Sequence, residues 1–336
     1  MAPQTLLPPL VSLAPHRSLL PVGPRARRIG LCPERGFVVD DLDPALALML
    51  DELTRPVDPG PLIERAVRRG ADPAAATALL AGLLRTGALV GCGPVRTTGR
   101  REHAVVLVVG DGPLAAGVVT GLVAAGVGTV HVQAGGTVTA ADLGTGLLDA
   151  DRGTDRAVAI AAAAARAVPG ATVSAPPQRL APDLVVLADA QAPRPGTADR
   201  LAVDGTAHLP VRLRDGVGVV GPLVLPGRTA CLRCLDRWRT ERDPGWPGVA
   251  AQLAGRPGRA DRACVAATAA LGTAQALAAL DDDAAPPTLE TTIELDLDAA
   301  TLVHRRWERH PGCPCGGPRH PRATCGVGDV GGRLGS

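Results

Sequence analysis

The sequence predicts an α/β protein: a doubly wound, largely parallel sheet, preceded by a small winged-helix-like domain and followed by a metal-bound C-terminal segment. Three observations support this prediction. From Ala104 onward, apolar strand-like runs alternate with helical stretches. Before that point, Asp-Pro pairs open three short helical segments. Near the C-terminus, two close cysteine pairs, Cys231 with Cys234 and Cys313 with Cys315, have the spacing of a four-thiolate zinc site.

The composition of the 336 residues excludes several functions. The net charge is only +2, and one Phe, three Trp and no Tyr leave few aromatic rings on which bases could stack, so we expect no nucleic-acid partner. The sequence also has no Lys and no Asn. A P-loop lysine, a Schiff-base lysine and a tyrosine general acid are therefore excluded.

Two stretches of the sequence are candidates for a signal peptide or a membrane-spanning segment, and neither has the composition that such a segment needs. Residues 1–27 are rich in Pro and Leu but lack a charged start followed by an unbroken apolar core, so we expect a loose N-terminal tail and no signal peptide. Residues 113–130 contain glycines and threonines and follow a strand and a glycine turn, which favours a buried helix and then a strand. We expect a cytoplasmic protein with no membrane partner, in which cysteines stay reduced.

Residues 28–92 begin with a predicted hairpin. Two apolar runs, Arg28–Leu31 and Phe37–Val39, are joined by the turn sequence Cys-Pro-Glu-Arg-Gly. We expect Ile29, Leu31, Phe37 and Val39 to form its core. Three helices should follow, each with Asp as N-cap and Pro as first helical residue, and a glycine should end the third; these positions are Asp43-Pro44, Asp58-Pro59, Asp72-Pro73 and Gly87.

This order of elements predicts a winged-helix-like peptide recognition element over residues 28–92. The outer face of the third helix is Ala, Thr and Gly with only Arg85 at its end, so it lacks the clustered cations that DNA phosphates require. A small apolar helix beside an open strand suits the addition of a peptide as an extra strand, with Leu79, Leu83 and Leu89 shaping the groove. A dimerisation or packing module is the alternative.

After a linker over residues 93–103, a βαβ unit carries a glycine-rich turn. The strand Ala104–Val109 leads into Gly110-Asp111-Gly112-Pro113-Leu114-Ala115, a helix and a second strand at Thr129–Val132. This GxGxxA pattern, in which Gly110, Gly112 and Ala115 are the motif positions, lets the backbone approach a phosphate at a helix N-terminus. An NAD site would also need an acidic residue near the end of the second strand, where Gln133 stands, so NAD is disfavoured.

Later elements complete the expected sheet. A buried strand ends at Asp189, Val217–Leu225 leads into the first cysteine pair, and an apolar helix over Ala266–Leu280 contains Gly272 and Gln275. Leu289–Leu297 alternates apolar and polar residues and predicts an antiparallel strand. Its acidic residues are interpreted as a solvated face; they are Glu290, Glu294 and Asp296.

A closed set of four thiolates leaves no coordination position for water, so the expected zinc is structural. His310, His320 or Cys325 could replace one ligand, and a disulfide is disfavoured without a secretory signal. The remaining cysteines lie in apolar surroundings and are interpreted as small core residues; they are Cys32, Cys92 and Cys264.

Taken together, the glycine turn, the strand ending in Asp189, the CxxC knuckle and the late cysteine pair resemble the ThiF/MoeB superfamily of ubiquitin-activating-type adenylyltransferases over residues 104–316. The phrase Val-Gly-Pro-Leu-Val-Leu-Pro-Gly-Arg-Thr-Ala-Cys-Leu-Arg-Cys is similar to the proteins that accompany YcaO cyclodehydratases in azoline peptide (TOMM) biosynthesis. This resemblance implies an N-terminal unit that binds the leader of a ribosomal precursor peptide, a YcaO-type partner and a homodimer. Residues 317–336 are expected to be a flexible tail.

Departures from the adenylyltransferase pattern limit the activity that the resemblance implies. Active members use an acid after the second strand, an Asn-Leu-x-Arg-Gln segment and a lysine, whereas this chain has Gln133, Ala141–Gly144 and no lysine. Asp189 alone matches as a catalytic candidate, with Arg200 as a possible basic neighbour. Removing one charge-stabilising donor typically costs on the order of a hundredfold in rate, so ATP is a doubtful cofactor.

We therefore predict a non-catalytic or degenerate ThiF-like scaffold that presents a precursor peptide to a YcaO-type enzyme. One alternative is an active adenylyltransferase acting on a peptide or carrier-protein C-terminus, in which Arg152 or Arg156 replaces the missing cations. Others are a cysteine nucleophile at Cys264 or Cys325 and a scaffold without an azoline pathway.

Overall fold

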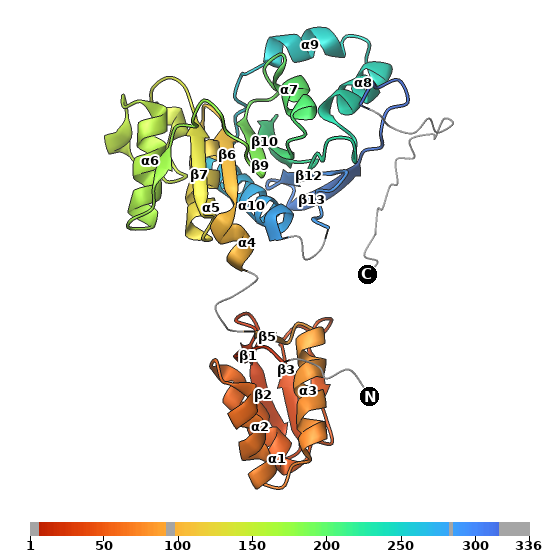
Figure 1. Ribbon diagram of the computed structural model, residues 1–336. Helices are drawn as coiled ribbons and strands as arrows, with labels where there is room; N and C mark the ends of the chain where they lie inside the picture. The colour runs from red at the N-terminus through yellow and green to blue at the C-terminus, as the bar shows by residue number, and fades with distance from the viewer. Residues whose placement is uncertain (1–6, 92–97, 282–284, 316–336) are drawn as a thin grey trace. The chain divides into compact units, whose positions relative to one another are not determined.

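The computed structural model describes residues 7–91, 98–281 and 285–315, and the chain divides into two compact units, Met1–Thr97 and Thr98–Ser336. Figure 1 shows each unit with its own helices and strands. The first unit corresponds to the expected recognition element, and the second carries the large sheet.

The N-terminal unit contains two small antiparallel sheets and three helices. One sheet has the order β2-β3-β4, and the other pairs β1 with β5. The expected hairpin is confirmed as the pair β3–β4, and the helices follow in the predicted order. The bounds are β1 Val11–Leu13, β2 Leu19–Gly23, β3 Ala26–Ile29, β4 Phe37–Val39, α1 Pro44–Asp51, α2 Pro59–Arg68, α3 Pro73–Arg85 and β5 Leu89–Gly91, with a 3₁₀ turn at Glu52–Thr54.

The three Asp-Pro pairs open these helices as predicted. Asp43, Asp58 and Asp72 are the N-caps, and their carboxylates accept hydrogen bonds of 2.8 Å from backbone N–H groups in the first turn. The proline that follows each cap has no N–H to leave unpaired at the first helical position. Gly87, with φ +66°, follows the end of α3 in the left-handed conformation that terminates helices.

The prediction of a loose tail over residues 1–27 is wrong for the part that is described. Val11 has no exposed surface, and β1 pairs with β5 in the register Val11 with Gly91. Arg27 is 5% exposed and joins β3 to α1 through two hydrogen bonds to Asp51. The physical reason is that short Pro- and Leu-rich runs gain their order from distant partners, which local sequence does not reveal.

Two further expectations for this unit need correction. Leu31 is 66% exposed and does not join the hairpin core, because the chain turns away after Ile29. Cys32 is exposed, and its thiol donates to Glu34, so it is not a core residue. Ile29 itself is buried with the helix residues that form the core of the unit, which are Leu46, Met49, Leu50, Leu53, Leu62, Leu80 and Leu83.

The second unit is a mixed sheet of eight strands in the order β13-β12-β11-β10-β9-β6-β7-β8. Five of these strands, from β8 to β10, run parallel, and β11 to β13 continue the sheet in antiparallel fashion. The bounds are β6 Val105–Val109, β7 Thr129–Gln133, β8 Val173–Ser174, β9 Leu184–Asp189, β10 His208–Arg214, β11 Val217–Val220, β12 Thr291–Asp296 and β13 Thr301–Arg306.

Helices cover both faces of this sheet (Figure 1). Residues of α5, α6 and α10 form the large apolar core on one face, and residues of α7 and α8 form a second cluster on the other. The bounds are α4 Thr98–His103, α5 Pro113–Ala124, α6 Arg156–Ala167, α7 Thr197–Val203, α8 Leu232–Arg242, α9 Trp246–Leu253 and α10 Arg262–Asp281, with 3₁₀ turns at Ala140–Asp142 and Asp149–Asp151.

Glycines let α5, α10 and the sheet approach closely. A Cβ on Gly117 of α5 would lie 2.7 Å from the Cβ of Ala269, and one on Gly272 would lie 2.9 Å from Val211 of β10. By length and composition, α10 is the one helix of the described residues that could cross a membrane, and 50% of its apolar window is buried inside the unit. The expected helix and strand over residues 113–130 are confirmed as α5 and the start of β7.

The predicted boundary between the units shifts slightly. The linker expected over residues 93–103 includes helix α4, which belongs to the second unit, so that unit begins at Thr98 and not at residue 104. Arg101 of α4 forms a bidentate ion pair with Asp281 at the end of α10, a long-range contact that local composition does not signal. The expected tail over residues 317–336 and Cys92 lie outside the described residues.

Candidate functional site

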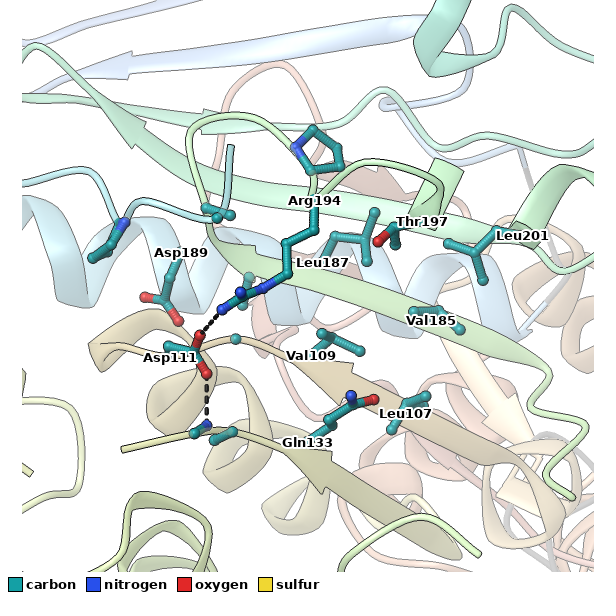
Figure 2. Close-up of a pocket in the computed structure, with 18 of the residues that line it drawn as sticks. Leu107, Val109, Asp111, Gln133, Val185, Leu187, Asp189, Arg194, Thr197 and Leu201 are labelled. Atoms are coloured by element: carbon teal, nitrogen blue, oxygen red, sulfur yellow. Dashed lines mark hydrogen bonds and ion pairs between the residues drawn. The ribbon is translucent and has the colours of Figure 1, made fainter. Parts of the chain in front are cut away.

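A pocket of about 570 Å³ opens at the carboxyl ends of β6, β7 and β9 (Figure 2). Strands β6 and β9 are neighbours, and the connection after β6 leads to β7 on one side whereas the connection after β9 leads to β10 on the other. Doubly wound folds bind ligands in the crevice at such a switch point. The pocket walls include Leu107 and Val109 from β6, Gln133 from β7, and Leu187 and Asp189 from β9.

Asp189, the catalytic candidate from the sequence, lies beside the glycine-rich turn, and its carboxylate contacts the first turn of α5. Its Oδ1 accepts a hydrogen bond from the backbone N–H of Leu114 (2.9 Å) and its Oδ2 one from Ala115 (3.2 Å), both in the first turn of α5. A helix N-terminus attracts anions through these unpaired N–H groups and the helix dipole. The chain thus places its own carboxylate where nucleotide-binding folds hold a phosphate.

The glycines of the turn are required by this carboxylate. A Cβ on Gly110 would lie 2.6 Å from Oδ2 of Asp189, and a Cβ on Gly112 would lie 2.6 Å from Oδ1. Real carbon–oxygen contacts are not that short, so any larger residue would displace Asp189. Asp189 itself has φ +69°, a left-handed conformation that is uncommon for a residue other than glycine.

Burial decides the electrostatics of Asp189, which is 3% exposed. Desolvation raises the pKa of its carboxyl group to about 7, although the backbone hydrogen bonds from Leu114, Ala115 and Gly112 act in the opposite direction. Near neutral pH the group therefore changes protonation state. Perturbed carboxyl groups of this kind occur at functional sites and also in structural networks.

Two residues that the sequence analysis did not select close one side of the pocket. Asp111 accepts from the backbone N–H of Gly135 at 2.6 Å and from Nη2 of Arg194 at 2.7 Å, as the dashed lines in Figure 2 show. Asp111 could have been selected from its place inside the glycine turn, but Arg194 lies in a loop with no motif. Because Asp111 neutralises Arg194, Arg200 is the remaining cation among the described lining residues.

Residues 141–144 stand where adenylyltransferases have the Asn-Leu-x-Arg-Gln segment, and here they have a structural role. Asp142 is 4% exposed, accepts from the backbone N–H and hydroxyl of Thr139, and pairs with Arg156 at 3.0 Å. Arg152 pairs with Asp149. Neither arginine lines the pocket, so the structure does not bring the two proposed substitutes to it.

The four predicted metal ligands converge. The Sγ atoms of Cys231, Cys234, Cys313 and Cys315 lie within 4.8 Å of one another, with nearest separations of 3.7, 3.6 and 3.4 Å. A regular tetrahedron with Zn–S bonds of about 2.3 Å has S···S edges of about 3.8 Å, whereas a disulfide requires about 2.05 Å. The cysteines are free, and their arrangement fits one tetrahedral ion.

The surroundings of the four thiols also suit a structural ion. Cys231 is the N-cap of α8, and side-chain hydrogen bonding between Cys231 and Cys234 lowers the pKa of Cys231 to about 4. His310 does not join the sulfur set: its Nε2 lies 2.8 Å from Glu241, and its ring contacts Trp238 edge-on. His320 and Cys325 lie outside the described residues, and Cys264 is buried in α10 away from the cluster.

The residues predicted to shape a peptide groove are mostly core residues. Leu83 is 4% exposed and Leu89 is 2% exposed, and both belong to the apolar core of the N-terminal unit. Leu79 is partly buried against the same core. These side chains offer little surface to a ligand, because α3 turns its leucine face inward onto β5 and the other helices.

The second unit thus has the doubly wound α/β fold with a pocket at its switch point, and a four-cysteine cluster lies on the neighbouring α8. Solved structures confirm the expected resemblance at the level of fold. Escherichia coli MccB with ATP superposes with a TM-score of 0.70 at 15% identity, covering 92% of this chain and 100% of that one. The microcin C7 biosynthetic enzyme MccB with N-formylated MccA gives 0.69 at 15% identity, with the same coverage.

A heterocyclase in complex with substrate and cofactor is also similar, with a TM-score of 0.64 at 14% identity over 92% of this chain and 40% of that one. No protein-family model and no curated protein sequence matches this chain. At these identities the likeness establishes the fold, and the activity has to be argued from the residues.

Proposed function

We propose that this protein is a ThiF-like scaffold that binds the leader of a ribosomally made precursor peptide through its N-terminal, winged-helix-like unit. In this proposal the scaffold presents the peptide to a separate YcaO-type cyclodehydratase. Structures with the same fold include MccB in complex with the peptide MccA and a heterocyclase in complex with substrate and cofactor, and the first of these supports a peptide partner.

The observation that carries this proposal is the open edge of β4. Among the described residues, β4 pairs only with β3, and Val38 at its centre is 46% exposed while Phe37 and Val39 pack on the core. An extended peptide can add to such an edge through main-chain hydrogen bonds, with side-chain pockets giving specificity. The proposed binding surface is therefore β4, in place of the buried Leu83 and Leu89.

The opposite edge of the same sheet is less suited to a peptide. Strand β2 contains Pro21, which has no N–H to donate, and its pairing with β3 shifts register between Pro21 and Gly23. Prolines and bulges protect edge strands against pairing. The sheet thus has one protected edge and one edge available to a partner.

The nucleotide pocket supports a role without adenylation. Asp189 accepts from two N–H groups in the first turn of α5, and Asp111 neutralises Arg194. Gln133 stands where an acidic residue would be expected to bind a ribose. Adenylation develops negative charge on a phosphate, which preorganised cations must stabilise. Arg200 alone is a poor substitute for that set.

A direct test is leader binding by the full-length chain. The probe is a fluorescein-labelled leader of a Cys/Ser/Thr-rich precursor encoded beside the gene, and fluorescence anisotropy measures the Kd. Val38→Asp should weaken binding about tenfold, because a charge on the edge disfavours strand addition. The matched control is Val22→Asp on β2, where the valine is 54% exposed. Equal binding by both variants would place the peptide elsewhere, and an absence of saturable binding would refute the proposal.

An active adenylyltransferase is the second candidate, favoured by the pocket of about 570 Å³ at the switch point. ATP–pyrophosphate exchange separates the two. Exchange that Asp189→Ala abolishes supports the enzyme, whereas leader binding without exchange supports the scaffold.

The proposal has two further parts: the four cysteines bind a zinc ion, and the protein forms a homodimer. The sulfur geometry supports the ion, which would fasten residues 313–315 to the start of α8.

A further inference from the structure

A buried arginine on the sheet has no hydrogen-bond or ion-pair partner among the residues that the structure describes. Arg212 lies near the end of β10, opposite Asp189 of β9 in the strand register, and is 5% exposed. Side chains alternate along β10, and Leu209, Val211 and Leu213 join the core under α5 and α10. Arg212 therefore projects from the other face, the one that carries α8.

No hydrogen bond or ion pair to Arg212 occurs among the described residues, although a guanidinium has five N–H donors. Among the described residues, the side-chain nitrogens that are both fully enclosed and unpaired belong to Arg17, Arg156 and His208. The nitrogens of Arg212 are unpaired but are not in this group, so each of them keeps some contact with solvent. Arg212 thus combines deep burial with guanidinium nitrogens that are unpaired and not fully enclosed.

The neighbouring acids are already engaged by other groups. Glu294 accepts from Arg305 at 3.2 Å through Oε1 and pairs with Arg214 at 3.1 Å through Oε2. Oδ1 of Asp236 accepts from the indole of Trp246 at 3.0 Å and from Arg239 at 3.2 Å.

Two neighbouring arginines make the burial of the Arg212 charge still less favourable. Arg239, whose guanidinium lies 4.9 Å from the ring centroid of Trp246 and 5.4 Å from that of Trp307, acts on Arg212 together with Arg214. Burial, and then these two arginines, lower the pKa of Arg212 to about 9, although the charges of Asp236 and Glu294 act in the opposite direction. A buried cation without a directly hydrogen-bonded counter-ion is unfavourable, and a ligand that pairs with it relieves this cost.

We infer that Arg212 is the binding site for a carboxylate group carried by a ligand. A planar guanidinium forms two parallel hydrogen bonds to a carboxylate, and this fork is the one left open in the cluster. A phosphate dianion would need a second open cation, but Arg214 and Arg239 are already paired. The site lies one strand away from the pocket that contains Asp189, and the inference does not depend on leader binding.

Intrinsic tryptophan fluorescence reports on this region. The three tryptophans of the chain are Trp238 in α8, Trp246 at the start of α9 and Trp307, and the last two contact Arg239. The full-length protein is titrated with acetate up to about 0.1 M at constant ionic strength, with acetamide as the uncharged control and inorganic phosphate as a second arm. We expect a saturable change with acetate only. No response to acetate, or a stronger response to phosphate, overturns the inference.

Arg212→Met removes the charge and keeps a long apolar stem. Without ligand it should raise the Tm by a few degrees, because a buried unpaired charge is lost, and it should abolish both the fluorescence response and the rise in Tm that acetate gives the wild type. Arg179→Met, at an exposed arginine, should do neither. A lower Tm or failure to fold would show that Arg212 has an internal structural role and would overturn the inference.

Arg212→Lys keeps the positive charge but loses the two parallel N–H donors of the guanidinium, so it should weaken the acetate response about tenfold.

Discussion

Oδ1 of Asp189 accepts a hydrogen bond of 2.9 Å from the backbone N–H of Leu114. This contact joins the end of β9 to the first turn of α5 and gives the helix an internal anion. It also explains the two glycines of the turn, since a Cβ on either one would lie 2.6 Å from a carboxylate oxygen. A motif that predicts nucleotide binding from sequence is thus used, at least in part, to hold a side chain of the same protein.

The stability of the protein should depend on pH through Asp189. Its folded-state pKa of about 7 lies above the usual 3.8, so the folded state binds more protons than the unfolded state between these values. The free energy of unfolding should be highest below about pH 4 as far as this group is concerned. It should then fall by on the order of 1 kcal/mol per pH unit up to about 7.

Urea unfolding at pH 5 and pH 8 measures this dependence, with Asp189→Asn as the reference because it does not titrate. The difference in unfolding free energy between wild type and variant should favour the wild type more at pH 5. A difference that is the same at both pH values would show that the carboxyl group keeps one protonation state.

Gly110→Ala should destabilise the second unit by about 1–3 kcal/mol. The new methyl would lie 2.6 Å from Oδ2 of Asp189 and 2.9 Å from the backbone oxygen of Ala188, and that oxygen cannot move without displacing β9. The matched control is Gly248→Ala in α9, where no atom lies within 4 Å. It should instead stabilise by up to about 1 kcal/mol through helix propensity. Thermal unfolding compares the two, and equal effects would contradict the close approach.

Metal analysis of protein purified without chelators should give about one zinc per chain. Cys231→Ser should lose that zinc and lower the Tm, because the ion fastens residues 313–315 to α8. Cys264→Ser, at a buried cysteine in α10, should keep the zinc even if it costs stability. Zinc-free wild-type protein, or zinc retained by Cys231→Ser, would remove the metal assignment.

Asp51→Ala should destabilise the N-terminal unit by about 1–3 kcal/mol, because it removes the two hydrogen bonds of 2.7 and 2.8 Å that buried Arg27 makes to Asp51 and leaves its charge unpaired. The exposed pair Arg25–Asp41 supplies the control, and Asp41→Ala should cost less than about 1 kcal/mol. Hydrogen exchange of β3 and α1 reports this unit separately from the other. Similar protection in both variants would mean that Arg27 finds another acceptor.

Much of the fold was predictable because its signals are local. The Asp-Pro caps of α1, α2 and α3 and the strand–turn–helix at Gly110 depend on neighbouring residues, and the structure confirms them. Errors occurred where order comes from distant partners. Strand β1 is fixed by β5 and Arg27 by Asp51, and neither pair shares a motif.

The candidate site divides in the same way. The spacing of the cysteine pairs is sufficient to predict their convergence, since two CxxC-like pairs can reach one ion. The pairing of Asp111 with Arg194 and the burial of Leu83 and Leu89 follow from how helices and loops pack. Local sequence carries no signal for these contacts.

The sequence by itself determined the three Asp-capped helices, the strand–turn–helix at Gly110, the absence of lysine and the four-cysteine set. Tertiary structure alone decided what the carboxylate of Asp189 contacts. Within the described part of the chain, it also decided which edge of the small sheet stays open and that Arg212 is buried without a hydrogen-bonded partner. The physical reason is range: caps, turns and ligand spacing act over a few residues, whereas desolvation and charge pairing depend on which distant groups the fold brings together.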